Sequence, residues 1–384
     1  MSAARPTLIL ITRNLPPLRG GMERLNLHMA MGLADRFHVL VLGPRGARAA
    51  LPATIEVRDC GGGTLMSFLV AACAQALLAA RRSPPAWVVA GSGLTAPLAW
   101  LASRASRARA AVYVHGLDIV VRHPVYRTLW LPFIRRMDLC IANSANTARL
   151  AREVGVPADR IVVIHPGVTL PEHMPSADAG AAFRHKHALE GRRVLLSVGR
   201  MTERKGLREF VRGALPAILR AHPNTLLVIV GDEAPDALAG AAPGAWCRLL
   251  DEARDAGLGE ALVHLGPIDD EHLAIAYASS DVHVFPVRDL PGDVEGFGMV
   301  AVEAAAHGLP TVAFAVGGVP DAVSDGVTGY LVDANDYDAF ARRVIRILDG
   351  ERSRPDVLVE RARSFAWSEF DRRMHHALAS DGKL

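Results

Sequence analysis

Cysteine, lysine and aromatic residues are scarce in this chain of 384 residues. The four cysteines lie far apart and form no C-x-x-C pair, so the sequence indicates neither a zinc site nor a disulfide framework. We therefore expect a reducing, cytoplasmic setting and no bound metal. Half of the residues are apolar and 22% are charged, which excludes an intrinsically disordered chain.

The sequence contains no clear signal peptide or membrane span. Its first apolar run, Thr7–Thr12, is too short for a signal peptide and fits a buried strand. Residues 61–80 are uncharged over about the twenty residues that a span requires. They open with three glycines and contain Ser67 and Gln75. We interpret them as a buried helix, with a membrane span as the alternative.

Positive charge is concentrated in the first half of the chain. Residues 1–180 contain 20 arginines and no lysine against 10 acidic residues, whereas residues 181–384 contain 23 basic and 30 acidic residues. An electropositive half suggests an anionic partner. The alternative is that arginine, which outnumbers lysine by 40 to 3, is simply the preferred basic residue of a solvated surface.

Short apolar runs alternate with helical patterns, which is typical of parallel sheets covered by helices on both faces. The first set of predicted strands is Thr7–Thr12, His38–Leu42, Thr54–Arg58, Trp87–Ala90, Ala111–Val114, Leu139–Ala142 and Ile161–Ile164. The second set is Val194–Val198, Leu226–Val230, Leu262–Leu265, Val282–Phe285 and Thr311–Ala315. The sequence therefore predicts an α/β protein with two Rossmann-like, doubly wound sheets.

These sets define a domain organisation. We place an N-terminal domain at 1–170, a linker rich in Pro, Ala, Gly and His at 171–190, and a C-terminal domain at 191–364. An amphipathic helix within 365–384 is expected to pack back on the first domain. Two such domains would face each other across a deep cleft, because open α/β sheets bind ligands outside the carboxyl ends of their strands.

The sharpest motif runs from Glu295 to Glu303. Gly296 and Gly298 precede an apolar helical run, so backbone N–H groups and the positive helix end can approach an anion. The two carboxylates are acceptors that fit sugar hydroxyls and a ribose diol. Alternatively, Glu295 caps the helix and Glu303 is a surface residue. The apolar residues around Glu303 favour a mostly buried helix instead.

A second motif, Val198–Gly206, places Arg200 and Lys205 after a buried strand. A guanidinium and an ammonium in one loop can clamp a diphosphate. Taken alone, the two residues would be interpreted as surface cations.

Together these motifs resemble the family-4 retaining glycosyltransferases of the GT-B fold. The resemblance spans nearly the whole chain. Further matching segments are Leu18–Glu23, Val114–Asp118, Ala142–Ser144, His165–Val168 and Gly231–Asp232. Two departures are visible: a histidine-proline-glycine sequence at 165–167, where the family usually has asparagine after proline, and an unusual loop at 288–294, which we expect to shape donor choice.

The resemblance implies that the domain at 1–170 binds the acceptor and the domain at 191–364 binds the donor. It also implies a role for each motif residue. Arg200 and Lys205 would bind the donor diphosphate, and Glu295 would hold sugar hydroxyls. Glu303 would hold the ribose, and His115 would lie beside the reacting sugar. The catalytic candidates are thus His115, Arg200, Lys205 and Glu295. The donor-binding candidates are Gly20, Gly21, Gly231, Asp232, Gly296, Phe297, Gly298, Met299, Val300 and Glu303.

The reaction implied by the resemblance is transfer of a hexose from a GDP- or UDP-linked sugar to a glycan or lipid-linked acceptor, with retention and without a metal or other cofactor. Fixed cations and a helix end would stabilise the charge on the leaving phosphate. Alternatives are a nucleotide-sugar epimerase, a sugar phosphorylase or a non-catalytic carbohydrate-binding protein. We expect no nucleic-acid partner.

Two other features have competing interpretations. A lone histidine beside a strand is usually a satisfied core residue, but His115 stands at a strand's carboxyl end, which favours a function. The segment Gly91–Ala96 matches the dinucleotide fingerprint G-x-G-x-x-A. It follows the fourth predicted strand and precedes Pro97, and no clear acidic residue ends the next strand, so a nicotinamide enzyme is disfavoured.

The basic first domain contains a candidate membrane surface. The arginines of this surface are Arg104, Arg107 and Arg109 and a second group, Arg122, Arg127, Arg135 and Arg136. The second group interleaves with Tyr126, Leu129, Trp130, Leu131 and Phe133. Cations with apolar anchors suit an anionic membrane surface and a lipid-linked acceptor. A peripheral position on the inner face of the cell membrane would follow. Alternatively, the aromatic face packs on its own sheet.

Overall fold

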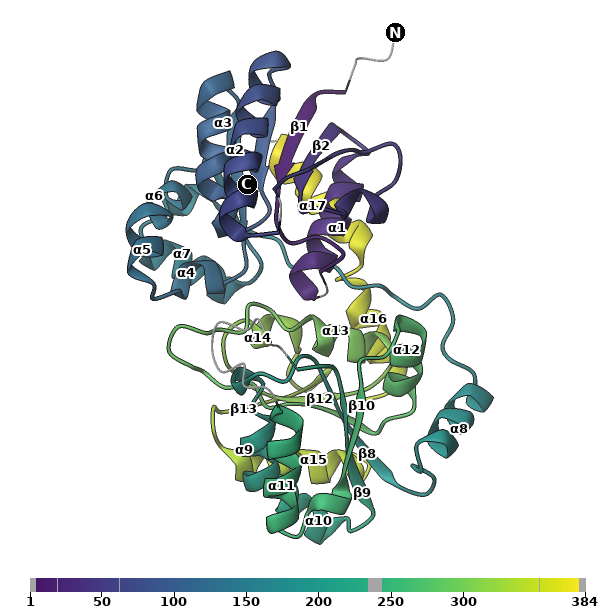
Figure 1. Ribbon diagram of the computed structural model, residues 1–384. Helices are drawn as coiled ribbons and strands as arrows, with labels where there is room; N and C mark the ends of the chain where they lie inside the picture. The colour runs from purple at the N-terminus through teal and green to yellow at the C-terminus, as the bar shows by residue number, and fades with distance from the viewer. Residues whose placement is uncertain (1–4, 19, 62, 234–243, 352, 380–384) are drawn as a thin grey trace. The chain divides into compact units, whose positions relative to one another are not determined.

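The computed structural model describes residues 5–18, 20–61, 63–233, 244–351 and 353–379. The chain divides into two compact units: unit 1 is Met1–Gly167 with Trp367–Leu384, and unit 2 is Val168–Ala366. Each unit is a parallel sheet with helices on both faces (Figure 1). This architecture confirms the predicted fold class of two doubly wound α/β sheets.

Unit 1 is built on a seven-stranded sheet of order β3-β2-β1-β4-β5-β6-β7. Its strands are β1 Thr7–Ile11, β2 His38–Gly43, β3 Glu56–Asp59, β4 Trp87–Ala90, β5 Arg109–Val114, β6 Leu139–Ala142 and β7 Ile161–Val163. Leu8 pairs in parallel with Val39 of β2 and with Trp87 of β4. The strand order reverses between β1 and β4, which is where doubly wound sheets bind ligands.

Helices cover both faces of this sheet. They are α1 Gly21–Leu33, α2 Leu65–Arg82, α3 Ala96–Ser106, α4 Leu117–Val120, α5 Pro124–Leu129, α6 Leu131–Ile134, α7 Ala145–Glu153 and α17 Trp367–Ala379. Alternate residues of β1 explain the two layers, since successive side chains of a strand point to opposite faces. Leu8 and Leu10 belong to the core under α1 and α17, whereas Ile9 and Ile11 belong to the core under α2 and α3.

The last helix, α17, packs within unit 1. Phe370 and Met374 are buried in the same core as β1. The indole Nε1 of Trp87 donates to the carbonyl of Leu378 at 2.9 Å, and His375 Nε2 lies 2.8 Å from the carbonyl of Gly32. The helix expected within 365–384 is thus attached to the first sheet over 367–379, and its final residues lie outside the described part of the chain.

Unit 2 contains a six-stranded sheet of order β10-β9-β8-β11-β12-β13. Its strands are β8 Arg193–Val198, β9 Thr225–Val230, β10 Leu262–Gly266, β11 Val282–Phe285, β12 Thr311–Phe314 and β13 Gly329–Val332. All twelve predicted strands are present, with ends that differ by at most two residues. The sequence missed only β13 among the described strands, because this four-residue edge strand is half-buried at Tyr330 and Leu331.

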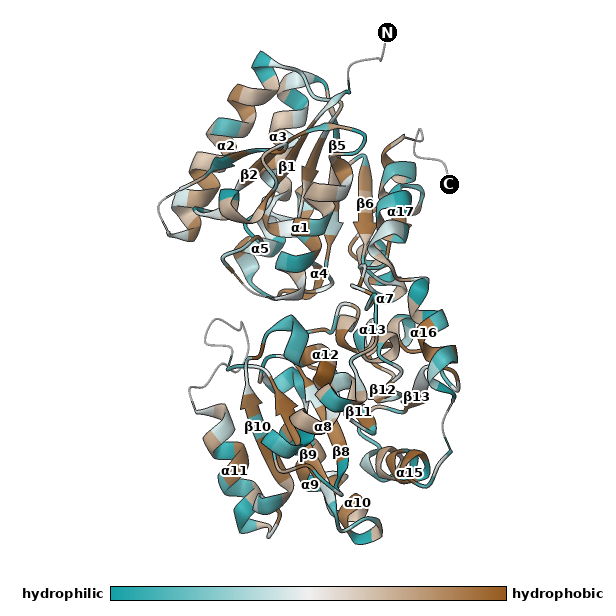
Figure 2. Ribbon diagram, turned by 90° about the vertical axis from the view of Figure 1, so that its right-hand side faces the viewer, coloured by the Kyte–Doolittle hydropathy of each residue, from teal (hydrophilic) through white to brown (hydrophobic). Residues whose placement is uncertain are grey.

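The helices of unit 2 also form two layers. Their bounds are α8 Ala177–Lys186, α9 Leu207–Gly213, α10 Leu215–Ala221, α11 Ala245–Asp255, α12 Asp270–Ala278, α13 Met299–Ala306, α14 Val319–Ala322, α15 Tyr337–Leu348 and α16 Pro355–Arg363. Figure 2 shows the apolar strands inside and the polar helix faces outside. The segment 171–190, expected to be a linker, differs from that expectation: it contains α8, whose Phe183 is buried in the core of unit 2.

Helix α2 has the length and hydropathy of a membrane span, alone among the described helices. By composition this is weak support for a span, because core helices of globular domains pass the same test. Phe68, Ala72, Ala76 and Ala80 are buried in the core that α2 shares with the sheet. The helix is therefore packed on unit 1, as its sequence predicted, although its other face is exposed.

Truncating Phe370 should test the role of α17. Phe370 is buried between Tyr113 and Trp367, with ring centroids 6.2 and 5.6 Å away. We expect Phe370→Ala to lower the free energy of unfolding by about 3–5 kcal/mol, because the change leaves a cavity. Urea denaturation measures this loss. The control is Ser368→Ala at an exposed position of the same helix; equal stability of the two variants would show that α17 does not support the sheet.

Candidate functional site

The candidate site begins at the loop that leaves β8. Lys205 ends a short 3-10 turn, Glu203–Lys205, and its side chain is only 16% exposed. Its Nζ lies 2.9 Å from Oε2 of Glu295 and 4.6 Å from the ring centre of Phe285. The structure thus brings together two predicted site residues that are 90 positions apart in the sequence.

Arg204 is a second cation on the same carboxylate, and it was not among the site residues predicted from the sequence. Its Nη1 donates to Oε2 of Glu295, and its Nε lies 3.0 Å from Oδ1 of Asp293. The side chains of Arg204 and Glu295 are 16% and 13% exposed. A signal was present in the sequence: adjacent cations at 204–205 and alternate acids at 293 and 295.

The charges in this cluster stabilise one another. Burial would raise the pKa of Glu295, but the positive charges of Arg204 and Lys205 outweigh it and lower that pKa to about 2. Burial lowers the pKa of Lys205, and Glu295 opposes this effect. Glu295 is therefore a carboxylate throughout the physiological pH range, and it can accept hydrogen bonds but cannot donate them.

Helix α13 begins directly after this cluster. Its N-cap residue, Gly298, has φ of 101°, a left-handed value that favours glycine, and a Cβ there would lie 2.9 Å from Phe285. Among the described residues, no side chain caps this helix start. The first N–H groups of a helix have no intrahelical acceptor, so the N-terminus at Met299 and Val300 can bind an anion.

Glu303 lies one turn into α13 and is buried. The hydroxyl of Tyr277 donates to its Oε2 at 3.2 Å, and the ring of His307 stacks on Tyr277 with centroids 5.3 Å apart. This environment excludes the interpretation of Glu303 as a surface residue. Tyr277, which the sequence analysis missed, aims the carboxylate that is expected to hold a ribose.

The remaining donor-binding candidates of unit 2 differ in what they can offer. Gly231 is structural: its φ is 133°, and a Cβ would lie 2.1 Å from the carbonyl oxygen of Gly199. Asp232 accepts a backbone hydrogen bond from Met201 at 2.9 Å, which braces the loop that carries exposed Arg200. The side chain of Phe297 is buried in the core of unit 2, so only its backbone can reach a ligand.

The candidates of unit 1 lie at the carboxyl end of the first sheet. His115 is buried, and its Nε2 lies 3.0 Å from the carbonyl of Gly91. Its backbone N–H donates to the carboxylate of Asp118. Gly20 and Gly21 form the start of α1, and a Cβ on Gly20 would meet the Glu23 carboxylate at 2.5 Å. Arg19 of this loop lies outside the described residues.

The glycines of the competing fingerprint have a packing role. A Cβ on Gly91 would lie 2.0 Å from Asn26 Oδ1, and one on Gly93 would lie 2.6 Å from the hydroxyl of Tyr126. Both glycines are therefore required by side chains of the domain itself. Their pattern needs no dinucleotide to explain it.

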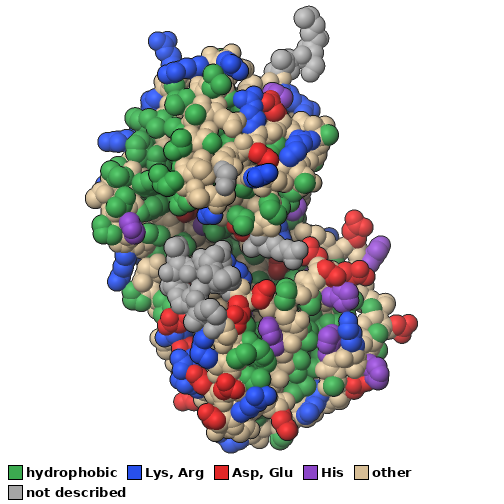
Figure 3. Space-filling model, viewed as in Figure 1, with side chains coloured by type: hydrophobic (Ala, Val, Ile, Leu, Met, Phe, Trp, Pro, Cys, Tyr) green, Lys and Arg blue, Asp and Glu red, His purple; other side chains and the backbone are tan. Residues whose placement is uncertain are grey.

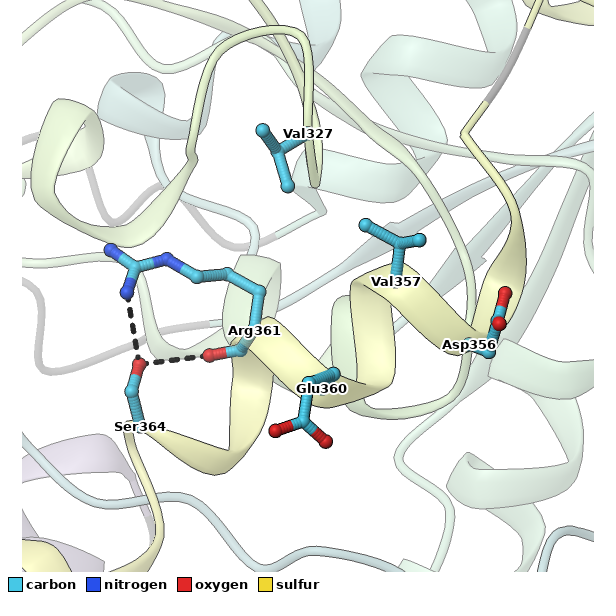
Figure 4. A pocket seen from close by; sticks show the side chains of 6 residues that line it. All are labelled: Val327, Asp356, Val357, Glu360, Arg361 and Ser364. Atoms are coloured by element: carbon cyan, nitrogen blue, oxygen red, sulfur yellow. Dashed lines mark hydrogen bonds between the residues drawn. The ribbon is translucent and has the colours of Figure 1, made fainter.

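A hollow of about 520 Å³ lies elsewhere in unit 2, on α16 and the turn before β13 (Figure 4). It is lined by Val327, Asp356, Val357, Glu360, Arg361 and Ser364. None of the predicted site residues lines it. Across the described ranges, no three His, Cys, Asp or Glu side chains are grouped to hold a metal ion.

Known proteins are similar to this chain in sequence and in fold. The description "Glycosyltransferase Family 4" matches residues 19–171, and "Glycosyl transferases group 1" matches residues 181–365. A "GDP-mannose-dependent alpha-(1-6)-phosphatidylinositol monomannoside mannosyltransferase" of Mycolicibacterium smegmatis is 33% identical over 361 residues, which cover 90% of each chain. The chain belongs to the family-4 glycosyltransferases of the GT-B fold.

A second relative supports this family, and two solved structures have the same fold. A mannosyltransferase of the same description from Mycobacterium tuberculosis is 30% identical over 89% of each chain. HepE of Anabaena, solved in complex with UDP, superimposes with a TM-score of 0.78 at 19% identity, over 97% of this chain and 99% of HepE. Sucrose-phosphate synthase of Thermosynechococcus elongatus has a TM-score of 0.79 at 23% identity, with 97% and 98% covered. These structures share the fold.

As a family-4 glycosyltransferase, the chain transfers a sugar from a nucleotide sugar to an acceptor. The cluster of unit 2 has the groups that such a donor requires. Lys205 and the start of α13 suit phosphate, whereas Glu295 and Glu303 suit hydroxyl groups. The assignment of individual residues to these roles stays a prediction.

Acid should remove the stabilisation that comes from Glu295. A carboxyl group with a depressed pKa stabilises the fold above its unfolded value of 4.5, and this contribution is lost as pH falls toward about 2. At pH 7 we expect Glu295→Gln to be less stable by roughly 3–5 kcal/mol, because it takes away the carboxylate that pairs with the largely buried Lys205. Denaturation from pH 7 to 2 should show this difference shrinking below about pH 4.5.

The control for this measurement is Glu56→Gln, which removes an exposed ion pair with Arg58. It should change stability by less than about 1 kcal/mol at every pH. A difference between wild type and Glu295→Gln that does not depend on pH would show that Glu295 is not held as a carboxylate by its two cations.

Proposed function

We propose that this glycosyltransferase retains the anomeric configuration, needs no metal, and moves a hexose from a nucleoside diphosphate sugar to a glycan or lipid-linked acceptor. The observation that carries this proposal is the buried Lys205–Glu295 pair beside the uncapped start of α13. The pair supports the proposal because its ammonium suits a leaving diphosphate and its carboxylate suits sugar hydroxyls. The pair also argues against a non-catalytic carbohydrate-binding protein.

The chemistry follows from these groups. The bond between the sugar C1 and the diphosphate oxygen breaks, and negative charge develops on the leaving phosphate. Fixed cations and a helix end stabilise that charge, and this preorganised electrostatic effect replaces the role a metal ion plays elsewhere. The acceptor oxygen bonds to C1 on the face that the diphosphate leaves, and the acceptor proton passes to the diphosphate.

For the donor, GDP-mannose is the first candidate. Relatives described as GDP-mannose-dependent match nine-tenths of the chain, and a UDP-hexose is the alternative because HepE binds UDP. For the acceptor, the same relatives favour a mannosylated phosphatidylinositol, which is a lipid-linked glycan. The loop at 288–294, which carries Asp293 against Arg204, is where we expect donor choice to be set.

Substitution of either residue of the Lys205–Glu295 pair should strongly reduce transfer. We expect Lys205→Ala and Glu295→Ala each to lower kcat/KM by a factor of about 10² or more, because each removes a charge that contacts the donor. Transfer from GDP-mannose and UDP-glucose is measured with the product's anomeric configuration determined by NMR. Exposed Lys186→Ala is the matched control. Unaltered transfer in both site variants, or an inverted product, would refute the proposal.

We further propose that unit 1 contacts an anionic membrane surface through α2 and α3. Of the expected anchors near α5 and α6, Leu131 is buried and Trp130 donates its Nε1–H to the carbonyl of Leu94 at 2.9 Å, whereas Leu129 is 57% exposed. On α2, by contrast, Met66 and Val70 are 63% and 64% exposed. Trp130 and Phe133 pack against the core of unit 1, which supports the alternative in which the aromatic face packs on its own domain.

Hydrophobic side chains gather over α2 and α3 (Figure 3). The exposed apolar residues there are Leu65, Met66, Val70, Leu78 and Leu101. Neither helix contains an acidic residue, and Arg81, Arg82 and Arg104 are exposed at their ends. An apolar stripe with cations at one end is complementary to anionic lipid, and it would place the enzyme, in the cytoplasm, on the inner face of the membrane.

Vesicle flotation separates the two candidate surfaces. The wild type should float with phosphatidylglycerol vesicles at low salt. A triple variant that combines Met66→Gln, Val70→Gln and Leu78→Gln should float several-fold less. The control, Val125→Gln with Leu129→Gln on α5, should float like the wild type. Flotation that is unaffected by the α2 substitutions, or absent in the wild type, would contradict this surface.

A further inference from the structure

The turn that carries Lys205 is fastened to the loop that carries Glu295 by two arginines. Arg204 of the turn binds Asp293 and Glu295 of the loop, and Arg288 of the loop binds Glu209 at 2.8 Å and Glu203 at 3.3 Å. The N–H of Arg288 also donates to the carbonyl of Arg204 at 2.8 Å. Only one of these arginines, Arg204, contacts the candidate sugar-binding carboxylate.

Both cations approach the same oxygen of Glu295. Lys205 and Arg204 each donate to Oε2, so Oε1 takes no part in the two ion pairs. A sugar hydroxyl can therefore be accepted by Oε1 while Oε2 stays paired. One carboxylate oxygen thus serves the protein and the other is available for the donor.

The proposed function creates a conflict for Lys205. The same ammonium is required by the donor diphosphate and by the buried carboxylate of Glu295. A carboxylate left in this position without a cation would be costly to keep ionised, and it would take up a proton. A protonated Glu295 would lose acceptor capacity for sugar hydroxyls.

We propose that Arg204 is a positioning residue that holds Glu295 ionised and in place when Lys205 turns to the donor diphosphate. This inference rests on the proposed function. Arg204 is suited to the task because Asp293 fixes its Nε while Nη1 reaches Glu295. A guanidinium can bind two carboxylates at once, which a lysine ammonium in the same turn does less well.

The charged and titratable groups around Glu295 are consistent with Arg204 as its permanent counter-ion and Lys205 as the cation for the donor. Arg204 and Lys205 face it from the turn, and Arg200 adds positive charge near Lys205. From β11, His283 lies in the same buried region, where burial first and Lys205 second lower its pKa to about 3. His283 is therefore neutral above about pH 4, and the arginine supplies the lasting charge.

The test compares Arg204→Met with Arg204→Lys, and uses Arg288→Met as the matched control for loop docking. We expect Arg204→Met to lower kcat/KM by about tenfold or more. When kcat/KM is measured against pH, the pH below which the activity of Arg204→Met falls should be about one to three units higher than for the wild type, because Glu295 loses its permanent counter-ion. We call this acidic fall of the profile the acid limb. In Arg204→Lys the acid limb should return most of the way to its wild-type pH. Arg288→Met should leave the limb at its wild-type position, whatever it does to KM.

The outcomes distinguish a failure of the proposed function from a failure of the role proposed for Arg204. Absence of transfer by the wild type with any nucleotide sugar would overturn the proposed function and this inference together. Transfer by the wild type, with the same acid limb in Arg204→Met, would overturn the inference alone. If Arg204→Met does not fold, Arg204→Gln carries the same expectation, since glutamine keeps a hydrogen-bond donor without the charge.

Discussion

One buried carboxylate, that of Glu295, organises the donor half of this enzyme. It lies between Lys205 and Arg204, and these charges hold its pKa near 2 against the effect of burial. Because a buried charge needs a partner, the pairing fixes the turn after β8 against the loop that enters α13. Helix α13 begins at Met299, four residues after Glu295 in the same loop.

The parallel sheet supplies the frame for this contact. Strands β8, β9 and β11 end at one edge, where close backbone approach at Gly231 and the left-handed turn at Gly298 bring loops and a helix start together. Tyr277 then orients Glu303 one turn along α13. The result is an edge with cations and N–H groups that suit phosphate and with carboxylates that suit hydroxyls. Phosphates and hydroxyls are the two kinds of group that a nucleotide sugar presents.

The sequence predicted the parts of the fold that rest on local pattern. Buried strands such as β8 and β9 are continuous apolar runs, so their positions were correct within two residues. The edge strand β13 and the helix α8 were missed, because a short half-buried strand and a helix with few buried side chains leave a weak pattern.

The site was predicted in part. Its motif residues were selected by resemblance, but the direct contact of Lys205 with Glu295 depends on folding of segments 90 positions apart. Arg204 and Tyr277 were missed because their roles are visible only through their partners. Composition also cannot tell on which side of a short helix an aromatic residue lies, and Trp130 and Phe133 of the expected membrane surface pack against the core of unit 1.

The most direct test is a crystal structure of the protein with a bound nucleoside diphosphate sugar. We predict that a phosphate oxygen lies within hydrogen-bond distance of Lys205 Nζ, that a sugar hydroxyl donates to Glu295, and that Arg204 remains on Glu295. A diphosphate bound away from Lys205 and the start of α13, with the Lys205–Glu295 pair undisturbed, would contradict the assignment of the donor site.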